Sequence, residues 1–250
     1  MISNKMPSSS AQDRQVSIWF QKIENGEIKL PRFQRHQAWD RSRIGSLLDT
    51  VILNLPLGVT LLLNVDKEHF VSRYIATAPK TGNRVTEHLL DGQQRLTSLW
   101  RTLHNNYSDV KFFLYISKYD RYYEKTEEEI EINVFYKTRY ENKKGNLMPL
   151  RADSPKDSFH RGLIPMELFR PGDISSEYES WVNDALIPIK PTSGEENYEE
   201  NLFSWMNYKN DILNLIRDYR ETISHFNLPY LALPTQTSKD TALQVFINMN

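Results

Sequence analysis

Five consecutive polar residues interrupt the apolar stretch "LLDGQQRLTSLW". Asp91 can hold a divalent cation or orient a water molecule, and Gly92 lets a ligand approach the backbone closely. Gln93 and Gln94 can donate or accept hydrogen bonds, and Arg95 carries a guanidinium that suits a phosphate group. These residues in this order predict a site for a phosphorylated small molecule. A plain helix start capped by Asp91 is the simpler alternative.

The elements around these residues would position them. The segment "VTEHLL" before the motif is typical of a strand, and Leu96, Leu99, Trp100 and Leu103 after it follow helical spacing. The first backbone N–H groups of a helix lack partners within the helix and lie at the positive end of its dipole. We therefore expect the phosphate to lie on the N-terminus of this helix.

A second polar cluster lies upstream in "LPRFQRHQAW", where Arg32, Gln34 and Arg35 precede Trp39. It repeats the Gln-Arg pairing of the first motif and adds two guanidinium groups. We expect these residues to bind the same phosphorylated ligand. The alternative is that both arginines make surface ion pairs, which contribute little to stability.

The remaining pattern mixes helices with unevenly spaced strands, which favours an α+β fold. Helices are expected over 16–23, 40–52, 96–103, 164–169, 176–186, 196–225 and 240–250, and strands over 59–65, 85–90, 110–116, 129–136 and 228–234. Residues 138–162 are polar and loop-like. We expect a core over 1–137 that carries the motif, followed by a mainly helical extension over 138–250. The last helix has no C-cap, so we expect the given sequence to be a piece of a longer protein.

The composition excludes several classes of protein. The formal net charge is −1, so no global field attracts nucleic acid, although a local basic groove remains open. No cysteine is present, which excludes disulfides and Cys-ligated zinc. No apolar stretch approaches the ~20 residues that span a bilayer, and no signal-peptide core is present, so we expect a cytoplasmic protein with no membrane partner. The sequence also has neither a Walker-type loop nor a His-Asn-His element, so nucleotide hydrolysis would not be of the P-loop kind.

The order of three segments resembles one known family. "IKLPRFQRHQAW", "LLDGQQRLTSL" and "DTALQVFINMN" resemble the N-terminal domain of GmrSD-type, modification-dependent restriction systems, over about residues 13–250. The resemblance implies a ParB/sulfiredoxin-like fold, with a small mixed sheet and surrounding helices. It also implies a nucleotide-binding and nucleotide-hydrolysing module of phage defence, often fused to or paired with an HNH-type nuclease domain.

The resemblance also assigns roles to residues. Asp91, Gly92, Gln93, Gln94 and Arg95 match the nucleotide motif, Gln34 and Arg35 match the upstream Gln-Arg, and Phe246 and Asn248 match the late element. It implies that Arg35 and Arg95 bind phosphates, that Gln94 positions water or ribose, and that Asp91 handles Mg²⁺ or the attacking water. Asn248 would close the site from the C-terminal side.

Three functions remain open at this stage. The first is a regulatory domain that binds and hydrolyses a nucleoside triphosphate (GTP, ATP or CTP) with Mg²⁺. The protein would act on DNA, with an HNH-type nuclease domain in the same chain or in a partner protein. The second is a non-enzymatic module that recognises DNA or a modified base. The third is a structural interaction domain. A homo-oligomer is compatible with each of them.

Overall fold

The structure is a computed structural model that describes residues 11–34, 39–66, 70–123 and 130–249. Its contacts divide the chain into two compact units that are interleaved along the sequence. Unit 1 combines residues 1–40, 55–100 and 225–250, and unit 2 combines residues 41–54 and 101–224. The expected division at residues 137 and 138 stays a prediction, because contact units need not be the parts that fold alone.

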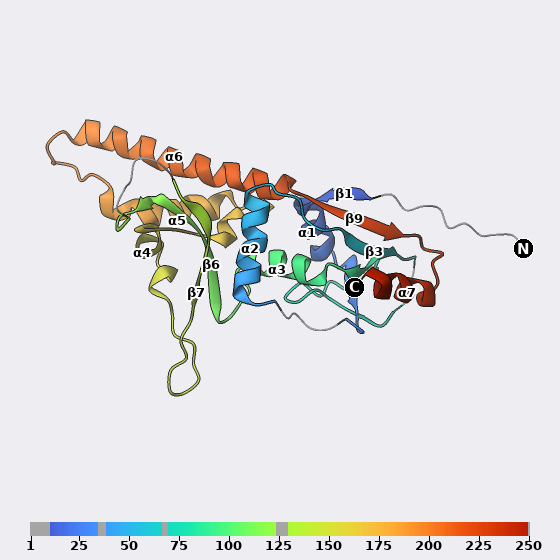
Figure 1. Cartoon of the computed structure of the whole chain (residues 1–250). Coiled ribbons are helices and arrows are strands. Elements are labelled where there is room, and N and C mark those ends of the chain that lie inside the picture. Colours follow the sequence, from blue (N-terminus) through green and yellow to red (C-terminus); the bar gives the residue numbers. More distant parts are fainter. Residues whose placement is uncertain (1–10, 35–38, 67–69, 124–129, 250) are drawn as a thin grey trace, which may run out of the picture. The chain divides into compact units, whose positions relative to one another are not determined.

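A six-stranded mixed sheet forms the centre of unit 1. Its strands follow the order β1-β9-β3-β5-β2-β4. The strands span β1 Gln12–Gln15, β2 Ile28–Pro31, β3 Thr60–Asn64, β4 Ser72–Arg73, β5 Glu87–Asp91 and β9 Asn227–Leu233. Figure 1 shows β1, β9 and β3 side by side, although β9 comes from near the end of the chain.

β3 carries apolar residues at successive positions, as expected for a strand that is buried on both faces of its sheet. Leu61 and Leu63 share a core cluster with Ala242, Val245 and Phe246 of helix α7 (Lys239–Met249). Leu62, which points to the opposite face, is also fully buried. Helices α1 (Val16–Glu24) and α3 (Gln93–Leu103) contact each other through Phe20 and Trp100, whose ring centroids are 5.2 Å apart.

A buried ion pair joins the first strand of unit 1 to the strand that carries the motif. Arg14 donates two hydrogen bonds to the carboxylate of Glu87, at 2.7 and 2.8 Å. The Arg14 guanidinium also lies 4.4 Å from the ring centroids of both Trp19 and Tyr230. Burial alone would lower the pKa of Arg14, but Glu87 outweighs this effect and raises it. The pair therefore fixes β1 against the rest of the sheet.

Unit 2 contains a three-stranded antiparallel sheet in the order β7-β6-β8. Its strands are β6 Val110–Asp120, β7 Ile132–Thr138 and β8 Arg161–Pro165. The α-helices of this unit are α2 Arg41–Ile52, α4 Pro155–Phe159, α5 Ser175–Leu186 and the long α6 Tyr198–His225. Short 3-10 turns cover Arg151–Asp153, Met166–Phe169 and Ile187–Ile189.

Helix α2 packs along the edge strand of this sheet. The Asp49 carboxylate accepts a hydrogen bond from the backbone N–H of Val134 on β7, at 2.7 Å. Burial raises the pKa of Asp49. The contact satisfies an edge N–H that would otherwise be open to another strand.

The α+β class is confirmed, with a mixed sheet and a largely helical later region, and most expected elements are present. The expected helix over 164–169 is wrong in its first part, because Ile164 and Pro165 complete β8 and only Met166–Phe169 form a 3-10 turn. The stretch 138–162 also holds the short helix α4, where the Ser154 hydroxyl accepts from the Asp157 N–H. The ParB/sulfiredoxin-like fold stays a prediction.

Candidate functional site

The polar motif lies at the mouth of a cleft of about 540 Å³ in unit 1. All five motif residues line this cleft, and so does Gln34 of the upstream cluster. The described lining residues are Phe33, Gln34, Trp39, Leu90, Asp91, Gly92, Gln93, Gln94, Arg95 and Phe246. The structure therefore brings together three segments that are far apart in the sequence.

Gly92 makes the transition from strand to helix. β5 ends at Asp91, and the backbone N–H of Leu96 donates to the carbonyl of Gly92 at 3.0 Å. Gly92 therefore takes the N-cap position, and Asp91 is the last residue of the strand rather than the cap residue. The first residues of α3, Gln93 and Gln94, therefore lie at the cleft.

Two constraints require glycine at position 92. Its φ is +89°, in the left-handed region that disfavours side chains. A Cβ atom there would lie 2.8 Å from Oγ1 and 3.0 Å from Cγ2 of the buried Thr60 on β3. The backbone at the mouth of the cleft is therefore held in place by packing against the neighbouring strand.

Arg95 ties the first turn of α3 to the segment before β3. Its guanidinium donates to the carbonyls of Gly58 and Val59, the latter at 2.9 Å, and lies 3.9 Å from the Asp91 carboxylate. Burial lowers the pKa of Arg95, and Asp91 opposes this effect. Because a guanidinium has five N–H donors, Arg95 can hold this segment and still donate to a ligand in the cleft.

Gln34 also combines a structural contact with a place in the cleft lining. Its side-chain amide donates to the carbonyls of Leu89 and Leu90 on β5, and the side chain is buried. This contact draws the segment after β2 toward the end of β5. Gln34 therefore acts as a positioning residue for the cleft wall.

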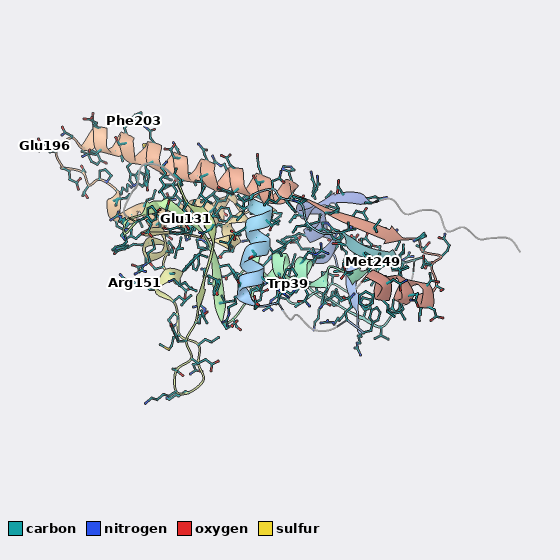
Figure 2. All side chains as sticks on the ribbon, in the orientation of Figure 1. Trp39, Glu131, Arg151, Glu196, Phe203 and Met249 are labelled. Carbon is teal, nitrogen blue, oxygen red and sulfur yellow. The ribbon has the colours of Figure 1, made fainter. Side chains whose placement is uncertain are left out.

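Aromatic rings form one wall of the cleft. Phe33 is 43% exposed, and its ring centroid lies 5.6 Å from that of Phe246 and 5.4 Å from that of Phe70. Trp39, labelled in Figure 2, lines the same cleft. The polar pattern alone does not predict Phe33 as a site residue. The one feature of the sequence that could have indicated Phe33 is its position between the predicted site residues Arg32 and Gln34.

Two other predicted residues, Arg32 and Asn248, are not among the described residues that line the cleft. Arg32 is exposed, and its backbone N–H donates to the carbonyl of Val71. Asn248 is exposed on α7, where its Oδ1 accepts from Gln244 at 2.9 Å. Arg35 lies outside the described residues, so its predicted phosphate contact stays a prediction.

Asp91 is the one carboxylate among the described residues that line the cleft. Within residues 11–34, 39–66, 70–123 and 130–249, no three His, Asp or Glu side chains gather as a metal site. Magnesium is commonly held by one or two carboxylates together with substrate phosphates, so a single Asp91 fits that cation. No helix in the described part of the chain is long and apolar enough to cross a membrane.

Two comparisons with known proteins bear on this site. The chain is 30% identical over 128 residues to an uncharacterized protein of Methanocaldococcus jannaschii, a match that covers 46% of the chain and 21% of that relative. The chain thus matches about a fifth of the relative's length. The family model described as "GmrSD restriction endonuclease, N-terminal domain" matches residues 16–250, which include every described residue of the cleft. The chain therefore belongs to the family of GmrSD restriction endonuclease N-terminal domains.

Proposed function

We propose that this chain binds a nucleoside triphosphate in the unit 1 cleft and hydrolyses it, as a regulatory domain of a DNA-targeting restriction protein. The observation that carries the proposal is the convergence of the α3 N-terminus, Arg95 and an aromatic wall on one cleft. Its volume of about 540 Å³ falls in the usual range of small-molecule sites.

The phosphate end of the ligand would lie on α3. Backbone N–H groups of the first turn point out of the helix, and its dipole favours negative charge. Arg95 adds a cation within the same wall. The Cβ position of Gly92 is directed at Thr60, so no side chain would stand between the Gly92 backbone and a phosphate in the cleft.

The base end would lie against the aromatic wall. The Phe33 ring is partly exposed although it contacts two other phenylalanines. A planar base can stack on such a ring, and stacking is tolerant of base identity. This arrangement leaves GTP, ATP and CTP as candidate ligands.

Asp91 and Gln94 carry the proposed chemistry. Phosphoryl transfer depends mainly on positioning and on neutralising charge. Asp91 would hold Mg²⁺ or orient the attacking water, and Gln94 would position that water or the ribose. A bound Mg²⁺ would supply charge neutralisation on the phosphate oxygens.

The wider role follows from the family. Restriction proteins act on DNA, so we propose DNA as a target of the full-length protein and an HNH-type nuclease domain, in the same chain or a partner, as the effector. The same proposal includes a ParB/sulfiredoxin-like core, a homo-oligomer, ligand contacts of Arg32 and Arg35, and closure of the site from the C-terminal side by Asn248.

A matched pair of variants tests nucleotide binding. Phe33→Ala removes a cleft ring, whereas Phe203→Ala removes a ring that is 66% exposed on α6 and labelled in Figure 2. Titration calorimetry with each Mg²⁺-nucleoside triphosphate should show binding of at least one nucleotide, and the tightest is used for the variants. Its Kd should rise about tenfold in Phe33→Ala, as loss of one stacked base predicts, and stay unchanged in Phe203→Ala.

Hydrolysis needs a separate measurement. Asp91→Asn keeps the shape of the side chain and removes its charge, so nucleotide should still bind while phosphate release falls about 100-fold. Binding without any release by the unmutated chain would reduce the proposal to a nucleotide sensor. Absence of binding by all four nucleoside triphosphates would refute it. DNA binding that weakens steeply with salt would then support the alternative of a DNA-recognition module.

A further inference from the structure

A second cleft, of about 340 Å³, lies on the three-stranded sheet of unit 2. It belongs to the sheet face that carries Tyr115 of β6, Phe135 of β7 and Leu163 of β8. Tyr115 is paired with both Asn133 and Leu163, so these side chains stand next to each other on one face. The three strands therefore form the floor of the cleft, and Tyr122 and Glu131 line it from just outside the strands.

Exposed rings stand over an apolar floor. Leu163 is 3% exposed and shares a core cluster with the fully buried Phe113, while Phe135 is 39% and Tyr122 is 75% exposed. Phe135 lies on the sheet face and Tyr122 in the turn after β6, so two exposed rings line this cleft. Their exposed area is suited to stacking against a planar ligand.

Two carboxylates are held in position at the same cleft. Asp120 accepts hydrogen bonds from the Tyr115 hydroxyl at 3.3 Å and the Tyr122 backbone N–H at 2.9 Å. Glu131, labelled in Figure 2, accepts from the Asn133 amide at 2.6 Å. Each carboxylate keeps lone pairs for further N–H donors. Burial and, to a smaller extent, the negative charge of Asp120 raise the pKa of Tyr115 to about 12. The Tyr115 hydroxyl therefore stays protonated and remains a donor.

Cations lie over the rings. The Lys137 ammonium is 4.8 Å from the Phe135 ring centroid, and the Arg161 guanidinium is 5.7 Å from that of Tyr122. They disfavour a cationic ligand, and the carboxylates disfavour a bare anion. A neutral planar group with N–H donors and an attached phosphate satisfies both sets of charges.

We propose that the unit 2 cleft binds a guanine base, carried by a nucleotide or by a single-stranded position of DNA. Guanine presents two N–H donors side by side, which a carboxylate can accept together. Its ring stacks on Phe135 and Tyr122, and its phosphate meets Lys137 or Arg161. This site is separate from the unit 1 cleft and does not depend on nucleotide hydrolysis.

Two tyrosines of nearly equal exposure provide the test. Tyr122 is 75% and Tyr140 is 79% exposed, but only Tyr122 lines the cleft. Binding of fluorescein-labelled d(TTGTT) and d(TTTTT) by the full chain would be measured by anisotropy, and binding of guanosine monophosphate by calorimetry, both without Mg²⁺. We expect d(TTGTT) to bind more tightly than d(TTTTT). Tyr122→Ala should weaken guanine binding about tenfold, and Tyr140→Ala should leave it unchanged.

Further measurements distinguish a DNA strand from a free nucleotide as the source of the guanine. Asp120→Asn should remove the preference for guanine while the variant stays folded by circular dichroism. Tighter binding of d(TTGTT) than of the monophosphate identifies a DNA strand as the source, and equal binding identifies a free nucleotide. Phe203→Ala, which removes an exposed ring outside the described lining of both clefts, should not change either affinity. Equal effects of Tyr122→Ala and Tyr140→Ala, no guanine preference, or tighter binding of a lysine-rich peptide would overturn the proposal.

Discussion

At the scale of single residues, the motif side chains combine ligand-facing and structural roles. Arg95 lines the cleft and also fixes Gly58 and Val59, and Gln34 lines it while holding the end of β5. Replacing either residue would therefore change the shape of the cleft together with its charge or hydrogen bonding. Phe33 is a cleaner probe of ligand contact because its side chain is 43% exposed and its contacts with Phe70 and Phe246 are between rings.

Gly92→Ala should lower the free energy of unfolding more than Gly145→Ala does. Gly145 also has a positive φ, +76°, but an added Cβ there meets nothing within 4 Å. Gly145→Ala therefore measures backbone strain alone, about 1 kcal/mol. Gly92→Ala adds the clash with Thr60 and should cost clearly more in urea unfolding. Equal losses in the two variants would show that Thr60 does not hold the strand-to-helix turn.

At the scale of elements, ion pairs add to the apolar contacts that join segments to their neighbours. Arg14 and Glu87 connect β1 to β5, and Arg139 and Asp153 connect the residue after β7 to the 3-10 turn at 151–153. The buried Arg14–Glu87 pair helps to hold β1 and β5 in one sheet, because breaking it leaves a buried charge without a partner.

Glu87→Ala should destabilise unit 1 by roughly 3–5 kcal/mol, because it leaves the Arg14 charge buried. The Arg14 and Glu87 side chains are 9% and 8% exposed. The control is Glu177→Ala, which breaks a pair with Arg170 in which Glu177 is 50% exposed, and should cost less than about 1 kcal/mol. Urea unfolding of the two variants would compare the losses. A loss at Glu87 as small as that at Glu177 would contradict the role of the buried pair.

Acid should weaken unit 2 through Asp153. Burial alone would raise the pKa of Asp153, but hydrogen bonds from Arg139 at 2.6 and 2.8 Å and from the Leu150 N–H at 2.8 Å outweigh it and lower the pKa. A lowered folded-state pKa adds stability above the unfolded value of about 3.9, and this stability is lost as the pH falls below it. Asp153→Asn should flatten the fall in urea midpoint between about pH 5 and 3. Identical curves for the variant and the unmutated chain would exclude this contribution.

At the scale of the whole molecule, the chain passes repeatedly between two compact units. Local signals in the sequence predicted the motif helix and the strand before it, because apolar spacing and glycine placement act over a few residues. They could not predict that β9 lies parallel to β3, with Tyr230 opposite Thr60, since that pairing joins distant segments. The role of Asn248, which the family resemblance implies and which is exposed on α7, stays a prediction.

A fragment ending at residue 137 tests the division of the chain that the sequence suggests. β9 lies between β1 and β3 and supplies partners to both, and it belongs to residues 227–233. We therefore expect residues 1–137 alone to give a poorly dispersed NMR spectrum and no cooperative unfolding, because β1 loses its partner and β3 gains an open edge. A well-dispersed spectrum with a cooperative transition would instead support an independent core over 1–137.

The central claim is that a nucleoside triphosphate binds at the N-terminus of α3. Residue-resolved hydrogen exchange of the full chain, with and without Mg²⁺ and the nucleotide that binds, tests it most directly. Gln93, Gln94 and Arg95 are the first three residues of α3, and all three line the cleft. The account predicts that their exchange slows when nucleotide is added. Slowed exchange confined to other segments, with these three amides unchanged, would contradict it.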